Sequence, residues 1–249
     1  MTLDRSAFLK PIAHRGLHDG KKLLENTAPA FSAALQKGYG IECDLQPAAD
    51  GTPFVFHDFT LERLVEAKGA IRSKPPASLK ALKYRDREIG MLTFAEFLEL
   101  AGGRGPLLVE IKSDFGRPVP GFLENVASLA RRYKGPLALM SFDPDVMATL
   151  ALLAPSVSRG IVSGVYEGRE WKVDKIGKPR AARLTDLLDS RPAAVAFYAY
   201  HVKALPRPVV QYAREVQGLP IFAWTVRSAS DRKTAEQYAD APIFEGYVP

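Results

Sequence analysis

Acidic side chains fall in short apolar segments of this chain at spacings that suit binding of a cation. Glu42 and Asp44 are two residues apart, so the two-residue period of a strand places both on one face. Glu110 follows an apolar run that is typical of a buried strand. Three carboxylates on neighbouring strands form an all-oxygen ligand set for Mg²⁺ or Ca²⁺. The alternative is a charge network in which Arg15 and Lys112 neutralise the carboxylates without a metal.

Two histidines end comparable segments and could move protons beside such a site. His14 ends the first strand-like segment, and His57 ends another. An imidazole accepts or donates a proton near neutral pH, so a pair supplies one base and one acid. A single histidine at a strand end is more often structural, but two beside three carboxylates favour catalysis. His18 and His201 lack such neighbours in the sequence and are interpreted as ordinary loop residues.

The elements that would hold these side chains alternate regularly between strand and helix. Strand-like segments cover residues 12–14, 40–46, 107–112, 137–141, 159–163, 194–198, 221–226 and 242–246. Helix-period segments cover residues 28–37, 93–101, 121–133, 144–153, 181–188, 209–217 and 231–238, and Thr27 is expected to cap the first of them. This alternation predicts an α/β fold, a (β/α)₈ barrel in one domain over residues 1–249.

One further strand-like segment, residues 53–58, interrupts this alternation. It follows the second strand after a short turn, and a parallel crossover needs about a dozen residues or more. We therefore expect it to run antiparallel to the second strand. Residues 58–90 then form a small insertion before the second helix.

Composition narrows the class of protein. The chain of 249 residues is 47% hydrophobic and 25% charged, which is typical of a folded globular protein. The single cysteine, Cys43, excludes an internal disulfide, and no apolar run reaches the roughly 18 residues of a membrane span. These features predict a soluble, cytoplasmic protein without a stable membrane anchor. The net charge of +6 comes without a nucleic-acid-binding motif, so we expect no nucleic-acid partner, and the oligomeric state stays open.

A basic segment, residues 164–180, follows the predicted fifth strand. It contains Tyr166 and Trp171 together with five cations: Arg169, Lys172, Lys175, Lys178 and Arg180. Connections that follow barrel strands lie on the catalytic face. We expect this segment to border the substrate entrance and to favour anionic alcohols; the alternative is a solvated loop.

Taken in order, the motifs resemble the glycerophosphodiester phosphodiesterase family. The matching motifs are His14-Arg15-Gly16, Glu25-Asn26-Thr27, Glu42-x-Asp44, His57-Asp58, Glu110-x-Lys112, Ser141-Phe142-Asp143-Pro144 and Trp224-Thr225-Val226. They extend over nearly the whole chain. The family folds as a (β/α)₈ barrel with an insertion after the second strand, in agreement with the strand pattern. Two departures are Arg227, where the family usually has Asn, and Glu245-Gly246-Tyr247-Val248-Pro249 in place of a Thr-Asp-Tyr-Pro ending.

The resemblance implies metal-dependent hydrolysis of a small-molecule glycerophosphodiester to sn-glycerol 3-phosphate and an alcohol. It assigns the metal, Mg²⁺ or Ca²⁺ with Mn²⁺ as a further option, to Glu42, Asp44 and Glu110. It makes His14 and His57 the acid/base pair, with either order open. It assigns substrate binding to Arg15, Lys112, Glu25, Asn26 and Trp224, although Trp224 could equally belong to the core. The alternatives are a lysophospholipase D-like phosphodiesterase with the same site, and a binding protein without catalysis, for which an acid/base pair would have no use.

Overall fold

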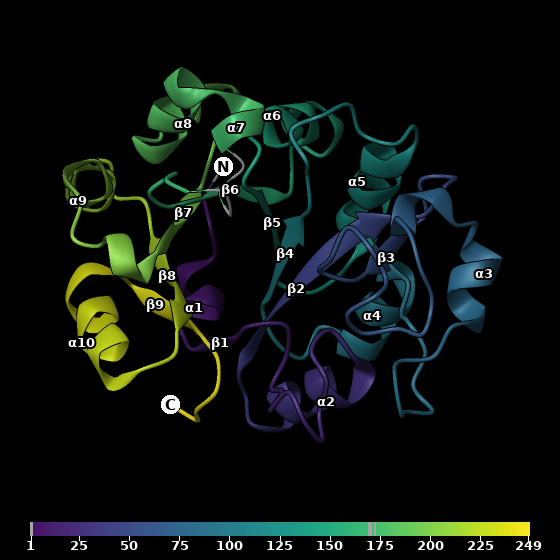
Figure 1. Ribbon diagram of the computed structural model, residues 1–249. Coiled ribbons are helices and arrows are strands. Elements are labelled where there is room, and N and C mark those ends of the chain that lie inside the picture. Colours follow the sequence, from purple (N-terminus) through teal and green to yellow (C-terminus); the bar gives the residue numbers. More distant parts are fainter. Residues whose placement is uncertain (1, 169–170, 172) are drawn as a thin grey trace.

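The structure is a computed structural model that describes residues 2–168, 171 and 173–249. Among these residues, nine strands form one sheet in the order β1-β9-β8-β7-β6-β5-β4-β2-β3, and an additional pairing of β1 with β2 closes it. All neighbours are parallel except β2 and β3. Eight parallel strands therefore form a closed (β/α)₈ barrel, as predicted. Figure 1 shows the C-terminal strands, in yellow, beside the N-terminal strand β1, in purple.

The strands of the barrel match the predicted segments closely. They are β1 (Ile12–Ala13), β2 (Gly40–Pro47), β4 (Leu107–Ile111), β5 (Leu137–Ser141), β6 (Ser158–Ser163), β7 (Phe197–His201), β8 (Ile221–Val226) and β9 (Ala241–Phe244). Only β7 is displaced, by three residues from the prediction. The chain makes a 3-10 turn, η3 (Arg191–Ala193), and Ala194 then adopts a left-handed conformation with φ of 47°, so β7 begins later.

Helices surround this barrel. The longer ones are α2 (Ala28–Gln36), α4 (Phe94–Ala101), α5 (Phe122–Arg132), α6 (Pro144–Leu153), α8 (Lys178–Thr185), α9 (Pro208–Glu215) and α10 (Ala229–Tyr238), and each overlaps a predicted helix. Short helical turns add α1 (Arg5–Phe8), α7 (Val173–Ile176) and η4 (Val202–Ala204). Thr27 precedes α2 as predicted, but its expected capping bond is wrong. Its hydroxyl donates to Leu24 O at 2.7 Å, because the loop bends back at this point.

The interruption after the second strand is confirmed as an antiparallel strand followed by an inserted segment. β3 (Pro53–Val55) pairs antiparallel with β2. The insertion contains η1 (Ile71–Ser73) and α3 (Pro76–Ala81), which Figure 1 places at one side of the barrel. Its apolar side chains form a cluster with those of β3, in which Phe54, Phe56, Leu61, Ile71 and Leu79 are all fully buried. The insertion is thus held by a hydrophobic core of its own against the barrel.

The main hydrophobic core lies between the strands and the helices, and Cys43 is a buried member of it. A second cluster, which includes Leu108, Met140 and Val162, contains residues that alternate with those of the main core along the strands. This alternation is the two-residue period of a strand, whose successive side chains point to opposite faces. None of the helices in the described ranges has the length and the apolar character that crossing a bilayer requires.

Candidate active site

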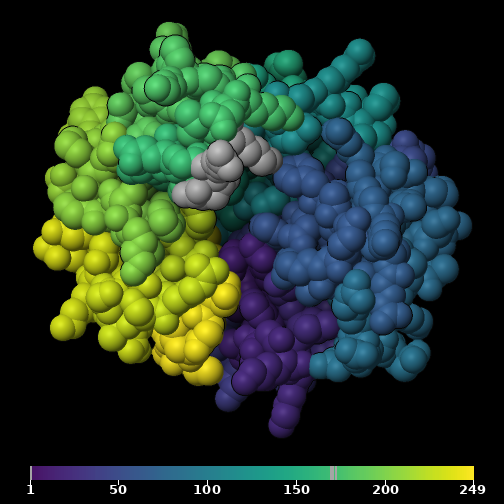
Figure 2. All heavy atoms as spheres, viewed as in Figure 1, coloured from purple at the N-terminus to yellow at the C-terminus, as the bar shows by residue number. Residues whose placement is uncertain are grey.

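A cavity of about 570 Å³ opens at the carboxyl ends of the strands, which is a usual size for a small-molecule site. Figure 2 shows the molecule hollowed at the centre of this face, with N-terminal, inserted and C-terminal segments around the rim. The lining includes most of the predicted site residues, namely His14, Arg15, Glu42, His57, Glu110, Lys112 and Trp224. Catalytic residues of (β/α)₈ enzymes lie at this end of the barrel.

The three predicted carboxylates come together on adjacent strands. Asp44 on β2 is the register partner of Glu110 on β4, and Glu42 precedes Asp44 by two residues. One carboxylate oxygen of each of the three lies within 4.8 Å of the others, and all three residues are buried. Burial raises the pKa of Glu42 well above its usual value, and the charges of Asp44 and Glu110 raise it further. The surroundings therefore favour the protonated form of Glu42, because they do not fully neutralise a third negative charge in the cluster.

Two cations lie against these carboxylates. Lys112 Nζ is 2.8 Å from Glu110 Oε1 and 3.4 Å from Asp44 Oδ1, and Arg15 Nε is 3.4 Å from Asp44 Oδ2. Burial alone would raise the pKa of Asp44, but Lys112, His57 and Arg15 outweigh burial and hold that pKa well below its usual value. Asp44 is therefore a carboxylate, whereas Glu42 lacks a comparable cation.

The backbone before α2 is arranged around the acidic cluster. Arg15 and Asn26 have φ of 55° and 56°, a left-handed conformation that is uncommon for residues other than glycine. In this conformation Arg15 N donates to Glu42 Oε2 at 2.9 Å. Asn26 N donates to Arg15 O at 2.9 Å, and Asn26 Nδ2 donates to Asp44 Oδ2 at 2.8 Å. Asn26 thus fixes both the loop and a carboxylate of the cluster.

His14 is held by a carboxylate from the opposite end of the chain. Its Nδ1 lies 2.5 Å from Glu245 Oε2, while its Nε2 lies 3.9 Å from Glu42 Oε2. Arg227 binds Glu245 through two hydrogen bonds, of 3.1 Å from Nε and 2.9 Å from Nη2. Burial lowers the pKa of His14 to about 4, although Glu245 opposes that shift. The neutral imidazole can therefore accept a proton at neutral pH.

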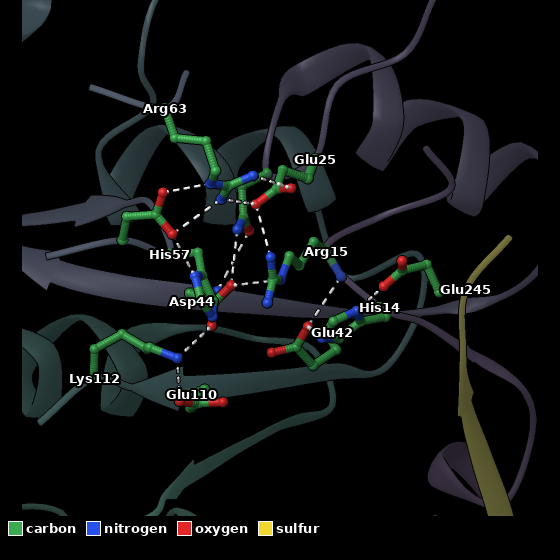
Figure 3. A network of polar contacts seen from close by, with 12 residues as sticks. His14, Arg15, Glu25, Glu42, Asp44, His57, Arg63, Glu110, Lys112 and Glu245 are labelled. Atoms are coloured by element: carbon green, nitrogen blue, oxygen red, sulfur yellow. Dashed lines mark hydrogen bonds and ion pairs between the residues drawn. The ribbon is translucent and has the colours of Figure 1, made fainter. Parts of the chain in front are cut away.

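His57 has a carboxylate partner of its own. A cation of the insertion binds this carboxylate and also binds the carboxylate that supports Arg15 (Figure 3). His57 Nδ1 lies 2.7 Å from Asp58 Oδ1. Arg63 donates to Asp58 and also to Glu25, with Nη1 2.9 Å from Glu25 Oε2. Glu25 in turn accepts from Arg15 Nη1 at 2.8 Å. The predicted substrate-binding residue Glu25 therefore lies behind Arg15, as its support.

The other side of the cavity is aromatic. Trp224 on β8 contacts Phe142 and Trp171, with ring centroids 5.2 and 6.0 Å apart. His201, at the end of β7, lies 5.0 Å from the Trp224 ring and 5.8 Å from the Trp171 ring. The interpretation of His201 as an ordinary loop residue is wrong, because its strand carries it into the cavity wall. His18 also lies near the site, with a ring nitrogen within 4.8 Å of ligand atoms of His14 and Glu245.

The sequence assigned no role in the site to four residues that complete it: Asp58, Arg63, Arg227 and Glu245. Asp58 stands in the His57-Asp58 motif, and two of the others also had a signal. Arg227 and Glu245 are the two departures from the family pattern, and the structure pairs them with each other. Arg63 lies in an insertion that has no recognisable motif. Its role depends on contacts with residues 5 and 38 positions away in the sequence.

The basic segment 164–180 contributes aromatic rings to the cavity. Tyr166 and Trp171 are in its lining, whereas its described cations are not. Lys175 Nζ pairs with Asp114 at 2.9 Å, and Arg180 Nη2 pairs with Asp145 at 2.7 Å. Two further cations of the segment, at positions 169 and 172, lie outside the described residues.

Residues 14–245 match the Glycerophosphoryl diester phosphodiesterase family. The matched range contains nearly the whole barrel and extends from His14 to its partner Glu245. The chain belongs to this family of enzymes. Relatives extend over most of its length. A glycerophosphodiester phosphodiesterase of Caldanaerobacter subterraneus subsp. tengcongensis is 26% identical over 230 residues, which are 88% of this chain and 86% of that protein. Glycerophosphodiester phosphodiesterase 1 of Bos taurus is 24% identical and covers 91% and 74% of the two chains.

Solved structures of the family share the fold. A phosphodiesterase of Oleispira antarctica, in complex with the product sn-glycerol 3-phosphate, superposes with a TM-score of 0.72 at 24% identity, covering 96% of this chain and 93% of that one. A glycerophosphodiester phosphodiesterase of Thermotoga maritima has a TM-score of 0.72 at 22% identity, with coverage of 95% and 94%. The barrel fold is therefore common to this chain and to these solved structures.

Proposed function

We propose that this protein hydrolyses glycerophosphodiesters to sn-glycerol 3-phosphate and an alcohol, with a divalent cation and a pair of histidines. The observation that carries the proposal is a single cavity that joins a buried acidic cluster to His14 and His57, each with its own carboxylate partner. The product bound in the Oleispira antarctica phosphodiesterase supports the same reaction here.

Glu42, Asp44 and Glu110 fit a hard divalent cation, which we infer to be Mg²⁺, Ca²⁺ or Mn²⁺. Their donor set is all oxygen, and their ligand atoms lie within 4.8 Å of one another. The raised pKa of Glu42, which burial and its two acidic neighbours cause, is the behaviour of a carboxylate that lacks a counter-charge. When bound, such a cation supplies neutralisation of the charge that develops on the phosphate oxygens.

Arg15 and Lys112 are suited to hold the phosphate. Both line the cavity and lie against carboxylates of the acidic cluster. The Arg15 guanidinium offers forked donors, and Glu25 keeps it in place through the bond at Nη1. Lys112 adds a compact charge whose pKa the neighbouring Glu110 and Asp44 raise against the effect of burial. Both groups stay charged at neutral pH and counter the phosphate charge.

We assign His14 as the base and His57 as the acid. The buried His14 is neutral, and its Nδ1 is occupied by Glu245, so Nε2 is the atom that accepts the proton of the attacking hydroxyl. That hydroxyl belongs to water or to the adjacent glycerol group. His57, whose side chain is 29% exposed, donates its proton to the leaving alkoxide, and Asp58 orients its ring through Nδ1.

The test is release of sn-glycerol 3-phosphate from glycerophosphocholine, measured with and without EDTA. We expect release that EDTA stops and that Mg²⁺, Ca²⁺ or Mn²⁺ restores. Release by metal-stripped protein would contradict the metal assignment. Binding of the diester without turnover would identify a binding protein instead, and preference for lysophosphatidylcholine would identify a lysophospholipase D-like enzyme.

A further inference from the structure

The cavity is divided into two chemically different halves. One half, on β1 to β4, contains the carboxylates, Arg15, Lys112 and both proposed catalytic histidines. The other half, on β5 to β9, is lined chiefly by aromatic and aliphatic side chains. Its floor consists of Met140, Val162 and Ile243, and its wall consists of Phe142, Tyr166, Trp171, His201 and Trp224. We call this second half the aromatic chamber.

Trp171 occupies the centre of the aromatic wall because Gly164 makes room for it. A Cβ atom on Gly164 would lie 2.6 Å from Trp171 Cη2 and 2.8 Å from His201 Cβ. With glycine there, the Trp171 ring packs 4.9 Å from the Tyr166 ring and 6.1 Å from the Phe142 ring, between centroids. The residue without a side chain at the end of β6 is therefore what lets this indole reach the cavity.

The chamber wall offers little charge and few hydrogen-bonding groups. Burial raises the pKa of the Tyr166 phenol, and burial together with Arg227 lowers the pKa of His201, so both rings are neutral at neutral pH. The Trp224 indole N–H already donates to Ala199 O at 3.1 Å. Two described cations of the 164–180 segment, Lys175 and Arg180, pair with acids outside the lining, and Arg227 at the rim is paired with Glu245.

Resting on the proposed function, we infer that the aromatic chamber binds the alcohol part of the diester and selects alcohols that end in an apolar, methyl-rich group, with Trp171 as the residue that determines this specificity. The glycerol part has hydroxyls that need polar partners, and those partners lie in the other half of the cavity. A methyl-rich end gains from contact with aromatic faces, and if it is a quaternary ammonium it also gains a cation–π interaction. An alcohol with N–H donors would lose stronger hydration there than the aromatic faces return, and a negative charge would lose hydration without compensation.

The experiment compares diesters that share the glycerophosphate half and differ in the alcohol. Glycerophosphocholine and the neutral, similarly shaped 3,3-dimethylbutyl ester are compared with the ethanolamine and serine esters. We expect kcat/KM for the two methyl-rich esters to exceed the others by about tenfold or more. A higher kcat/KM for the choline ester than for the dimethylbutyl ester would indicate a cation–π contribution in addition to apolar contact. Equal values for these two esters would indicate apolar contact alone. Ethanolamine or serine esters that react as fast as choline would overturn the inference.

Two variants assign the effect to Trp171. Trp171→Ala is expected to lower kcat/KM for the methyl-rich esters about tenfold and to change the ethanolamine ester less than about twofold. Gly164→Ala keeps the indole but displaces it, so it should reproduce that loss of selectivity if Trp171→Ala fails to fold. Lys175→Ala, in the same segment but paired outside the cavity, is the matched control and should keep the wild-type ratios.

The outcomes separate this inference from the proposed function. If all four esters release sn-glycerol 3-phosphate and Trp171→Ala lowers every rate equally, the proposed function stands and the specificity role of Trp171 is refuted. If no ester is hydrolysed by the metal-loaded protein, the proposed reaction itself fails.

Discussion

At the scale of single residues, the site depends on charges that are concentrated in a small buried volume. Glu42, Asp44 and Glu110 compete for two cations, and Glu42 receives the smaller share. A bound divalent cation would favour the charged form of every carboxylate in the cluster, so it would lower the pKa of Glu42 most. Cation binding is therefore linked to proton release.

Binding of Mg²⁺ or Mn²⁺ should release protons, and Glu42→Gln should abolish most of that release. The side chain of this variant has no proton to lose and has one fewer charged oxygen. We expect its metal affinity to fall by more than about 100-fold. Loss of a residue that hydrogen-bonds to a metal ligand, without binding the metal itself, usually lowers the affinity by about 10- to 100-fold. Isothermal titration in buffers of different ionisation enthalpy measures both quantities. Undiminished proton release in Glu42→Gln would contradict this explanation.

Glu245→Gln should lower kcat by about 10- to 100-fold, less than the 10²- to 10⁴-fold expected for His14→Ala. The carboxylate both orients His14 and raises its pKa against burial, so an amide lowers that pKa further. Because the base works when neutral, the acidic limb of the kcat/KM profile should move to lower pH. A profile measured alongside Asp240→Asn, a carboxylate bound to Arg214 away from the cavity, provides the control. A pH profile of kcat/KM that does not move in Glu245→Gln would contradict the role of the contact between Glu245 and His14.

Residue types and strand spacing were enough to predict the acidic cluster, since Glu42 and Asp44 share a face by the period of a strand. They were not enough to predict the partners of the histidines. Glu245 is 231 residues from His14 in the sequence and meets it only because β9 pairs with β1 when the barrel closes. A contact of that kind depends on the register of the whole sheet, which no local pattern encodes.

At the scale of elements, the insertion after β3 does more than cover one side of the barrel. Arg63 reaches from it to Asp58, the partner of His57, and to Glu25, the partner of Arg15. The position of both supports therefore depends on one side chain of the insertion. The sequence predicted an insertion after the second strand but not this role, because Arg63 belongs to no motif.

Arg63→Lys should reduce kcat/KM by about tenfold with little change in the thermal unfolding midpoint. A lysine has one terminal nitrogen and cannot donate to two carboxylates in the forked manner of arginine. Arg85→Lys, in the same insertion and bonded to Glu62 O, should stay within about twofold of the wild type. Steady-state kinetics of the two variants make the comparison. Equal losses would mean that any change in the insertion disturbs the site.

At the scale of the whole molecule, the closed barrel leaves little room inside. A Cβ on Gly160 in β6 would lie 2.3 Å from Cε2 of Phe197, a ring that is fully buried and cannot move aside. Gly160→Ala should therefore lower the free energy of unfolding by about 1–3 kcal/mol. Gly90→Ala is the control, because its Cβ would come no closer than 3.6 Å to another residue. Chemical denaturation measures the free energy of unfolding of both variants. Equal values would contradict the prediction, because they would mean that the barrel adjusts to a side chain at position 160.

The aromatic wall has an optical consequence. The chain has two tryptophans, and both of them, Trp171 and Trp224, lie in the wall of one cavity. The tryptophan fluorescence of the whole protein, excited selectively over that of its nine tyrosines, therefore originates at the site where we expect substrate to bind. Displacement of water from the indoles by an apolar alcohol should shift the emission to shorter wavelength, so occupancy can be followed without a label. A Trp171→Phe variant leaves Trp224 on β8 as the single tryptophan. Its emission then reports on the contact between substrate and that part of the cavity wall.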